Sequence, residues 1–105
     1  MQKIQMLSEK IEEELNDACA YIDEAIEMGD SDKATADLYA QLSAEEMGHV
    51  DKLHARVVAL IDAYRKDKGE PPAEMLWRYN YLHDLHKKKA AKIKIKQAIY
   101  KEGLK

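Results

Sequence analysis

The stretch IEEELNDACAYIDEAIEMGDSDKATADLYAQLSAEEMGHV, residues 11–50, decides the fold. Its first half repeats apolar residues at steps of three and four, which is the period of an amphipathic helix. Gly29 then interrupts the pattern, and Ser31 or Asp32 can cap a second helix. Because only a short turn separates the two helices, we expect them to pack antiparallel as a hairpin.

The same periodicity continues on both sides of this stretch. It predicts helices over residues 3–28, 33–67 and 73–101, and nothing in the chain is typical of a strand. We therefore predict an all-α fold, a single domain over 1–105 in which a third long helix follows the hairpin 3–67. The predicted apolar stripe of the second helix consists of Leu38, Leu42, Val50, Leu53, Val57, Leu60 and Ile61.

Composition narrows the class of protein. The chain has 105 residues, of which 46% are hydrophobic and 35% charged, as is typical of a soluble helical domain. It has no apolar run of about 18 residues, so we expect no membrane span. The first ten residues lack the apolar core of a signal peptide, which favours the cytoplasm. A single cysteine cannot form an intrachain disulfide.

Charge is distributed unevenly along the chain. Residues 1–86 contain 9 Lys and Arg against 19 Asp and Glu, a net charge of −10, whereas residues 87–105 contain 8 Lys and 1 Glu, a net charge of +7. The basic end can pair with the acidic body or meet an anionic partner. We do not expect a nucleic-acid partner, because the basic end contains no arginine and the acidic body would repel a long polyanion.

Three residues of the hairpin suggest metal chemistry. Glu46 and His49 lie three apart, so they share one helix face and can bind the same ion. Glu14 lies on the inward face of the first helix, about as far before the Gly29 turn as Glu46 lies after it. A buried carboxylate is costly unless it is paired or bound to a metal. The three side chains should therefore meet as one cluster, and core packing alone does not require this.

Tyr21 lies seven residues after Glu14, two turns along the same face. Its hydroxyl could donate to a ligand carboxylate. The alternative is a tyrosine at the boundary of the core whose hydroxyl is hydrated.

The pattern resembles the ferritin-like superfamily, in which a Glu on one helix and a Glu-x-x-His on the next occur twice in a four-helix bundle. The motif EEL with Tyr21 after it, followed by EExxH, is similar to the half-ferritin arrangement of encapsulated ferritins. Rubrerythrins have nearly the same spacing between the Glu and the Glu-x-x-His. The resemblance covers residues 8–60. The third helix, with Trp77 and its lysines, does not match, and no C-terminal encapsulin-targeting extension is recognised.

The resemblance implies a function. Glu14, Glu46 and His49 would be iron ligands, with Glu46 bridging two ions, and Mn or Zn are alternative metals. Because one chain supplies half of such a site, two copies would pair antiparallel into a four-helix bundle, giving a homo-oligomer that is at least a dimer. The implied activity is that of a ferroxidase, an oxidoreductase that oxidises Fe(II) at a di-iron centre, with the same three residues as its catalytic groups.

A second hypothesis about the function stays open. It is a non-catalytic oligomeric helical module, of a kind found in phage-like gene neighbourhoods, whose half-site is vacant or holds a structural metal. In this reading Glu14, Glu46 and His49 satisfy one another in a polar network.

The remaining histidines receive a simpler interpretation. His54 and Asp51 are expected on a polar flank at the surface. His83 and His86, again three apart, could form a second metal or entry site, but we favour a role at a subunit contact.

Overall fold

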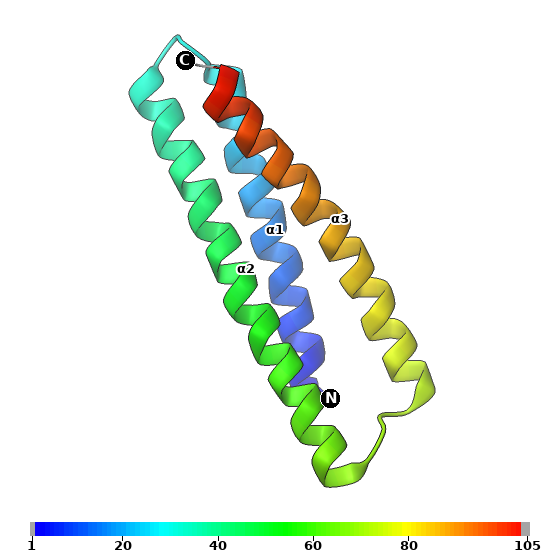
Figure 1. Cartoon of the computed structure of the whole chain (residues 1–105). Coiled ribbons are helices and arrows are strands. Elements are labelled where there is room, and N and C mark those ends of the chain that lie inside the picture. The colour runs from blue at the N-terminus through cyan, green and yellow to red at the C-terminus, as the bar shows by residue number, and fades with distance from the viewer. Residues whose placement is uncertain (1, 104–105) are drawn as a thin grey trace.

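The computed structural model describes residues 2–103 and folds them into three long helices. They are α1 (Gln2–Met28), α2 (Lys33–Lys68) and α3 (Ala73–Gly103), and the described part of the chain contains no strand. The helices lie side by side in a rod of 55 × 17 × 17 Å (Figure 1). The all-α prediction is confirmed, and each helix begins and ends within two residues of its predicted bounds.

Local chemistry explains where the helices stop. Gly29 takes a left-handed φ of 52°, and its N–H donates to the carbonyl of Ala25 at 3.2 Å, which closes α1. The Asp32 carboxylate then caps α2 by accepting from the backbone N–H of Thr35 at 3.1 Å. Gly69 ends α2 in a similar way: its φ is 82°, and its N–H donates to the carbonyl of Arg65 at 3.0 Å. These stops fix the lengths of the hairpin arms.

The core lies between α1 and α2 and is covered on one side by α3. Two clusters of buried residues build it. The larger contains Ile4, Ile11, Leu15, Ala18, Met47, Val50, Val57, Ile61 and Ile93, and the smaller contains Ile22, Ala25, Ala36 and Tyr100. One part of the predicted α2 stripe is wrong. Leu38 is 53% exposed, because the buried face of α2 runs instead through Ala36 and Ser43.

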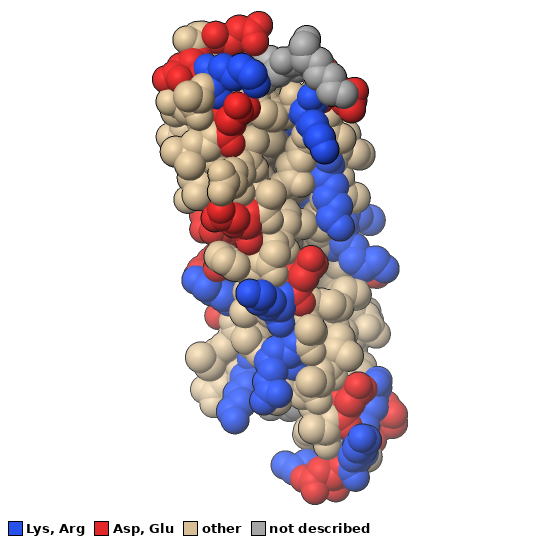
Figure 2. Space-filling view, turned by 60° about the vertical axis from the view of Figure 1, so that its left-hand side comes forward, with Lys and Arg blue, Asp and Glu red and all other residues tan. Residues whose placement is uncertain are grey.

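Helix α3 packs mainly on α1, and charge complementarity fixes its orientation. Lys89 donates to Glu12 at 3.0 Å and also to Asn16, and Lys96 donates to Asp23 at 2.7 Å. Part of the basic C-terminal charge is thus used within the chain, against the acidic body. Lys and Arg side chains form a column along the upper right-hand side of the face in Figure 2.

The outer side of α3 carries large apolar residues. Its inner line passes through His86, Ile93 and Tyr100. Exposed large residues occupy other faces of this helix, namely Trp77, Tyr81, Leu85, Ile95 and Ile99. Helix α3 is therefore apolar on two sides, and only one of them is covered within a single chain.

Ser43 makes a buried polar link between all three helices. Its fully buried hydroxyl donates to the carbonyl of Ala18 at 2.7 Å and accepts from the side-chain amide of Gln97 at 2.9 Å. Ser43→Ala should lower the free energy of unfolding by about 1–2 kcal/mol, because the amide of Gln97 loses its acceptor. Urea denaturation would measure this change. In a double-mutant cycle with Gln97→Ala, purely additive effects would contradict the link.

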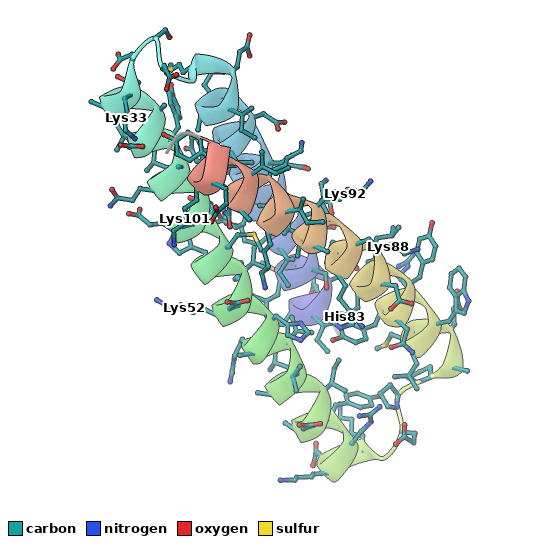
Figure 3. The ribbon with its side chains drawn as sticks, turned by 45° about the horizontal axis from the view of Figure 1, so that its top comes forward. Lys33, Lys52, His83, Lys88, Lys92 and Lys101 are labelled. Atoms are coloured by element: carbon teal, nitrogen blue, oxygen red, sulfur yellow. The ribbon has the colours of Figure 1, made fainter. Side chains whose placement is uncertain are left out.

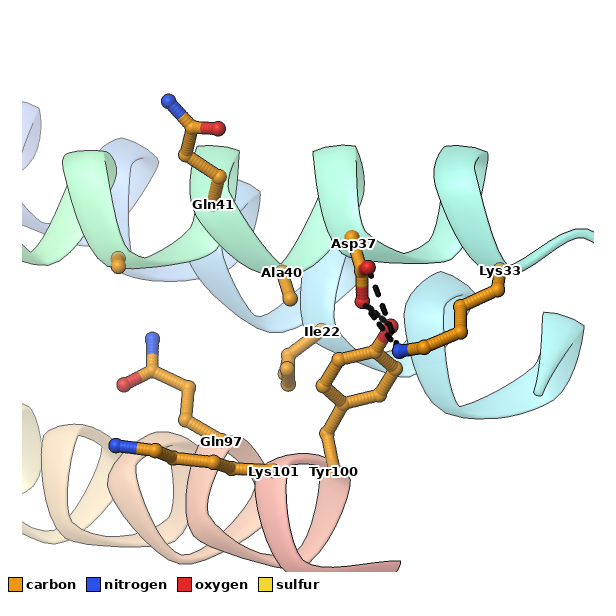
Figure 4. Close-up of a pocket in the computed structure, with 9 residues that line it drawn as sticks. Ile22, Lys33, Asp37, Ala40, Gln41, Gln97, Tyr100 and Lys101 are labelled. Atoms are coloured by element: carbon orange, nitrogen blue, oxygen red, sulfur yellow. Dashed lines mark hydrogen bonds and ion pairs between the residues drawn. The ribbon is translucent and has the colours of Figure 1, made fainter. Parts of the chain in front are cut away.

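Tyr100 should make the free energy of unfolding depend on pH in the alkaline range. Its hydroxyl donates to Asp37 at 2.5 Å, beside Lys33 in a pocket of about 440 Å³ (Figure 4). Burial, and then the bond to Asp37, raise the pKa of Tyr100 from 10.0 to about 12. The folded state holds this proton more tightly, so the stabilisation is complete below pH 10 and is lost as the pH rises to about 12.

Comparing the wild type with Tyr100→Phe tests this dependence. The difference between their unfolding free energies should shrink between pH 10 and about 12. A difference that stays constant over this range would show that the phenol is not responsible.

None of the helices in residues 2–103 combines the length and apolar character needed to cross a bilayer.

Candidate metal centre

The antiparallel hairpin brings the three predicted residues together. Glu14 comes from the middle of α1, and Glu46 and His49 come from one face of α2. One ligand atom from each of the three lies within 4.8 Å of the other two. Among the residues that the structure describes, they are the one set of three or more such side chains to meet this closely. Counting helix turns from Gly29 therefore predicted the cluster correctly.

The imidazole links the two carboxylates. Nδ1 of His49 lies 3.7 Å from Oε2 of Glu14 and 3.7 Å from Oε1 of Glu46. These distances are too long for good hydrogen bonds, which are about 2.7–3.2 Å long. The side chains of Glu14 and Glu46 are 12% and 18% exposed, whereas that of His49 is 51% exposed. The two carboxylates are thus the buried part of the cluster, and the imidazole is its solvent-exposed part.

Glu46 carries the clearest sign of a missing ligand. Its Oε2 atom is buried and has no hydrogen-bond partner among residues 2–103. An unsatisfied buried acceptor costs about 1–3 kcal/mol, and more when it is charged. Folded proteins rarely keep such an atom without a partner, an ion or a water molecule. The donor set of two carboxylates and one imidazole fits a divalent metal ion, and this oxygen would gain the partner it lacks.

One positive charge lies nearby. Nζ of Lys10 is 3.7 Å from Oε1 of Glu14, one turn away on α1. The hydrogen bond and charge of Glu13, followed by the charge of Glu14, raise the pKa of Lys10. Because the Lys10 side chain is 53% exposed, it compensates the cluster only weakly. Among the residues that the structure describes, no Lys or Arg forms an ion pair with Glu46.

The cluster lies on the side of the hairpin that α3 leaves open. Glu12 and Glu14 are two residues apart, so they point about 200° apart around α1. Glu12 contacts His86 and Lys89 of α3, whereas Glu14 faces His49 of α2. Helix α3 therefore cannot supply further ligands to this cluster.

Tyr21 lies about two helical turns after Glu14 on α1. Its ring packs against Tyr39 of α2 with centroids 6.0 Å apart. This contact fixes the ring at the seam between the two helices. Donation from its hydroxyl to a ligand carboxylate stays a prediction.

The structure corrects the sequence interpretation of His54 and gives His83 and His86 contacts within the chain. His54 was expected at the surface but is half-buried, and its ring stacks on that of His83, with centroids 4.7 Å apart. His86 is buried against α1, where its Nε2 lies 2.9 Å from Glu12. Sequence reasoning missed Glu12 as a partner, because the contact depends on how α3 lies along α1.

Comparison of the chain with family models, with curated protein sequences and with solved structures finds no match.

Proposed function

We propose that the chain is a ferritin-like metal protein whose di-iron site is shared between two copies. Glu14, Glu46 and His49 are its ligands, and Glu46 bridges the two ions. The observation that carries this proposal is the buried, unpartnered Oε2 of Glu46 within a cluster of ligand atoms. A bridging carboxylate uses both of its oxygens, which would give this atom its partner.

The second copy follows from the donor count. Two carboxylates and one imidazole are half of the four Glu and two His that hold a di-iron pair in ferritin-like bundles. The cluster lies on the open side of the hairpin, and the large exposed Leu38 lies about three turns before His49 on the same face of α2. A second hairpin packed antiparallel on this side would bury such residues and complete a four-helix bundle. Its own cluster would then lie opposite the first across the two-fold axis.

The proposed reaction is the oxidation of Fe(II). Two Fe(II) ions each give one electron to a molecule of O₂, which takes up two protons and leaves as H₂O₂. A carboxylate-rich pair of sites supplies the open coordination positions and the closeness that this two-electron step needs. The chain contributes negative charge through Glu14 and Glu46, which attracts the cation, and an imidazole at the rim that orients it.

Oxidation of iron tests the activity. Metal-free protein is loaded with Fe(II) without oxygen, air is admitted, and absorbance is followed in the near ultraviolet. We expect the wild type to oxidise Fe(II) faster than Glu46→Ala does. The matched control is Glu45→Ala, which removes the exposed neighbouring carboxylate and should behave as the wild type. Equal rates for the wild type and Glu46→Ala would overturn the enzymatic proposal.

Oligomeric state tests the shared site. Sedimentation of the wild type should show a dimer or a multiple of it. Leu38→Lys places a charge on the open side without touching a ligand, and should shift the protein toward monomer and weaken iron binding together. A monomeric wild type that binds iron normally would exclude the shared site.

The non-catalytic module remains the second candidate. The observation in its favour is that His49 already lies near both carboxylates, as in a self-contained polar network. Elemental analysis after growth with added iron separates the two proposals. Two ions shared by two chains give one metal ion per chain, whereas less than half an ion per chain would favour the module.

A further inference from the structure

Three of the four histidines lie together in a second place, away from the cluster of Glu14, Glu46 and His49. A cavity of about 200 Å³ lies among α1, α2 and α3, and its lining includes Asp51, His54, His83 and His86. In Figure 3, His83 points from α3 toward the space between the helices, whereas Lys88 and Lys92 project outward. The proposed iron site uses none of the four lining residues.

The four residues form two matched pairs. Asp51 and His54 lie three apart on α2, and His83 and His86 lie three apart on α3, so each pair shares one helix face. The pairs meet across the cavity, because the rings of His54 and His83 stack with centroids 4.7 Å apart and planes 8° from parallel. Two pairs at this spacing on facing helices offer four donors to one small volume.

His86 is held as metal-binding histidines usually are. Its side chain is 11% exposed, and its Nε2 lies 2.9 Å from Oε2 of Glu12 on α1. Histidines that bind metal generally give their second N–H to a carboxylate, which fixes the ring and raises its basicity. With the proton on Nε2, Nδ1 is the nitrogen that keeps the lone pair. Burial lowers the pKa of both His83 and His86, which favours the neutral imidazole that binds metals.

We propose that His54, His83 and His86, together with Asp51, bind one divalent cation of the Zn²⁺ class. Three imidazoles and one carboxylate suit Zn²⁺ and other transition-metal ions of borderline softness. The oxygen-rich cluster of Glu14 and Glu46 suits chemically harder metal ions. Within residues 2–103, only Glu14, Glu46 and His49 already hold three such ligand atoms within 4.8 Å. Binding in the cavity therefore requires the stacked rings of His54 and His83 to turn toward a common ion.

Charges of both signs surround the cavity. Asp51 lines it, and Glu12 lies behind His86, where Lys89 also pairs with it. Lys87 also lines the cavity and opposes a cation, but its flexible side chain is exposed and can keep its charge in solvent. Bound metal would join α2 to α3, which otherwise packs mainly on α1. The ion would therefore strengthen the weakest of the three helix contacts.

Zinc titration of the whole chain tests the proposal directly. The probe is Zn²⁺ alone, and the readout is the imidazole NMR signals of the four histidines in Glu46→Ala, in which the first cluster is broken. We expect the signals of His54, His83 and His86 to shift together and saturate at one Zn²⁺ per chain, while His49 stays unchanged. A response of His49 alone, or of no histidine, would overturn the second site.

Variants give an independent measurement. In the Glu46→Ala background, His83→Asn or His86→Asn should weaken Zn²⁺ binding at least tenfold, and Glu12→Gln about tenfold through loss of the carboxylate behind His86. The matched control is Glu9→Gln, which neutralises an exposed carboxylate of α1 outside the cavity and should leave the affinity unchanged. Zinc should also raise the melting temperature of Glu46→Ala, and His83→Asn should abolish that rise. Unchanged affinity in both cavity variants would overturn the proposal, whatever the outcome of the iron experiments.

Discussion

Glu46→Leu is expected to make the metal-free protein more stable while abolishing metal binding. The substitution removes a carboxylate oxygen that is buried without a partner, and it places an apolar side chain beside the core. Relieving an unsatisfied buried acceptor should raise the free energy of unfolding by about 1–3 kcal/mol. Chemical denaturation in the presence of a chelator would measure the gain. A residue that lowers stability and yet lies in a cluster of ligand atoms is typical of a functional site.

The neighbouring Glu45 supplies the control for this prediction. It is exposed and accepts a hydrogen bond from Gln41 at 3.1 Å, so Glu45→Leu should change stability by less than about 0.5 kcal/mol. Glu46→Gln keeps the shape of the side chain and removes its charge, so it should recover part of the gain. If Glu46→Leu were instead less stable than the wild type by more than 1 kcal/mol, on the order of a lost hydrogen bond, Glu46 would have a structural partner.

The helices and the cluster could be predicted from sequence because their determinants are local. Gly29 and Asp32 stop one helix and start the next through contacts within four residues. In an antiparallel hairpin, residues equally far from the turn lie at the same height. Glu14 and Glu46 therefore lie close together regardless of where α3 packs, and the structure brings them together as expected.

The position of α3 could not be predicted in this way. It has apolar residues on two sides, so periodicity does not say whether Ile93 or Ile95 faces the core. Pairs such as Lys96 with Asp23 decide this, and they join residues more than seventy positions apart. The stacking of His54 on His83 depends on the same register. The sequence interpretation therefore missed the contact between these two histidines, although each lay in a correctly predicted helix.

Ile93→Ala should cost about 2–5 kcal/mol of unfolding free energy, the usual range for deleting a fully buried isoleucine side chain. Ile93 is fully buried in the larger core cluster, which also contains Leu15 of α1, and few other apolar residues of α3 pack into that cluster. We expect the loss to fall mainly on the docking of α3. Hydrogen exchange should become faster along α3 than along α1, because the hairpin keeps its own core. Thermal unfolding would give the overall change.

Ile95→Ala makes the matched control, since it deletes the same atoms two residues away in the same helix. Ile95 is 59% exposed, so its replacement should change stability by less than about 0.5 kcal/mol. Two residues correspond to about 200° around a helix, which makes the pair a direct measure of how α3 is rotated. A large cost for Ile95→Ala with a small one for Ile93→Ala would mean that α3 presents its opposite face to α1. Lys96 and Asp23 could then not pair as they do, because that pairing depends on the same rotation.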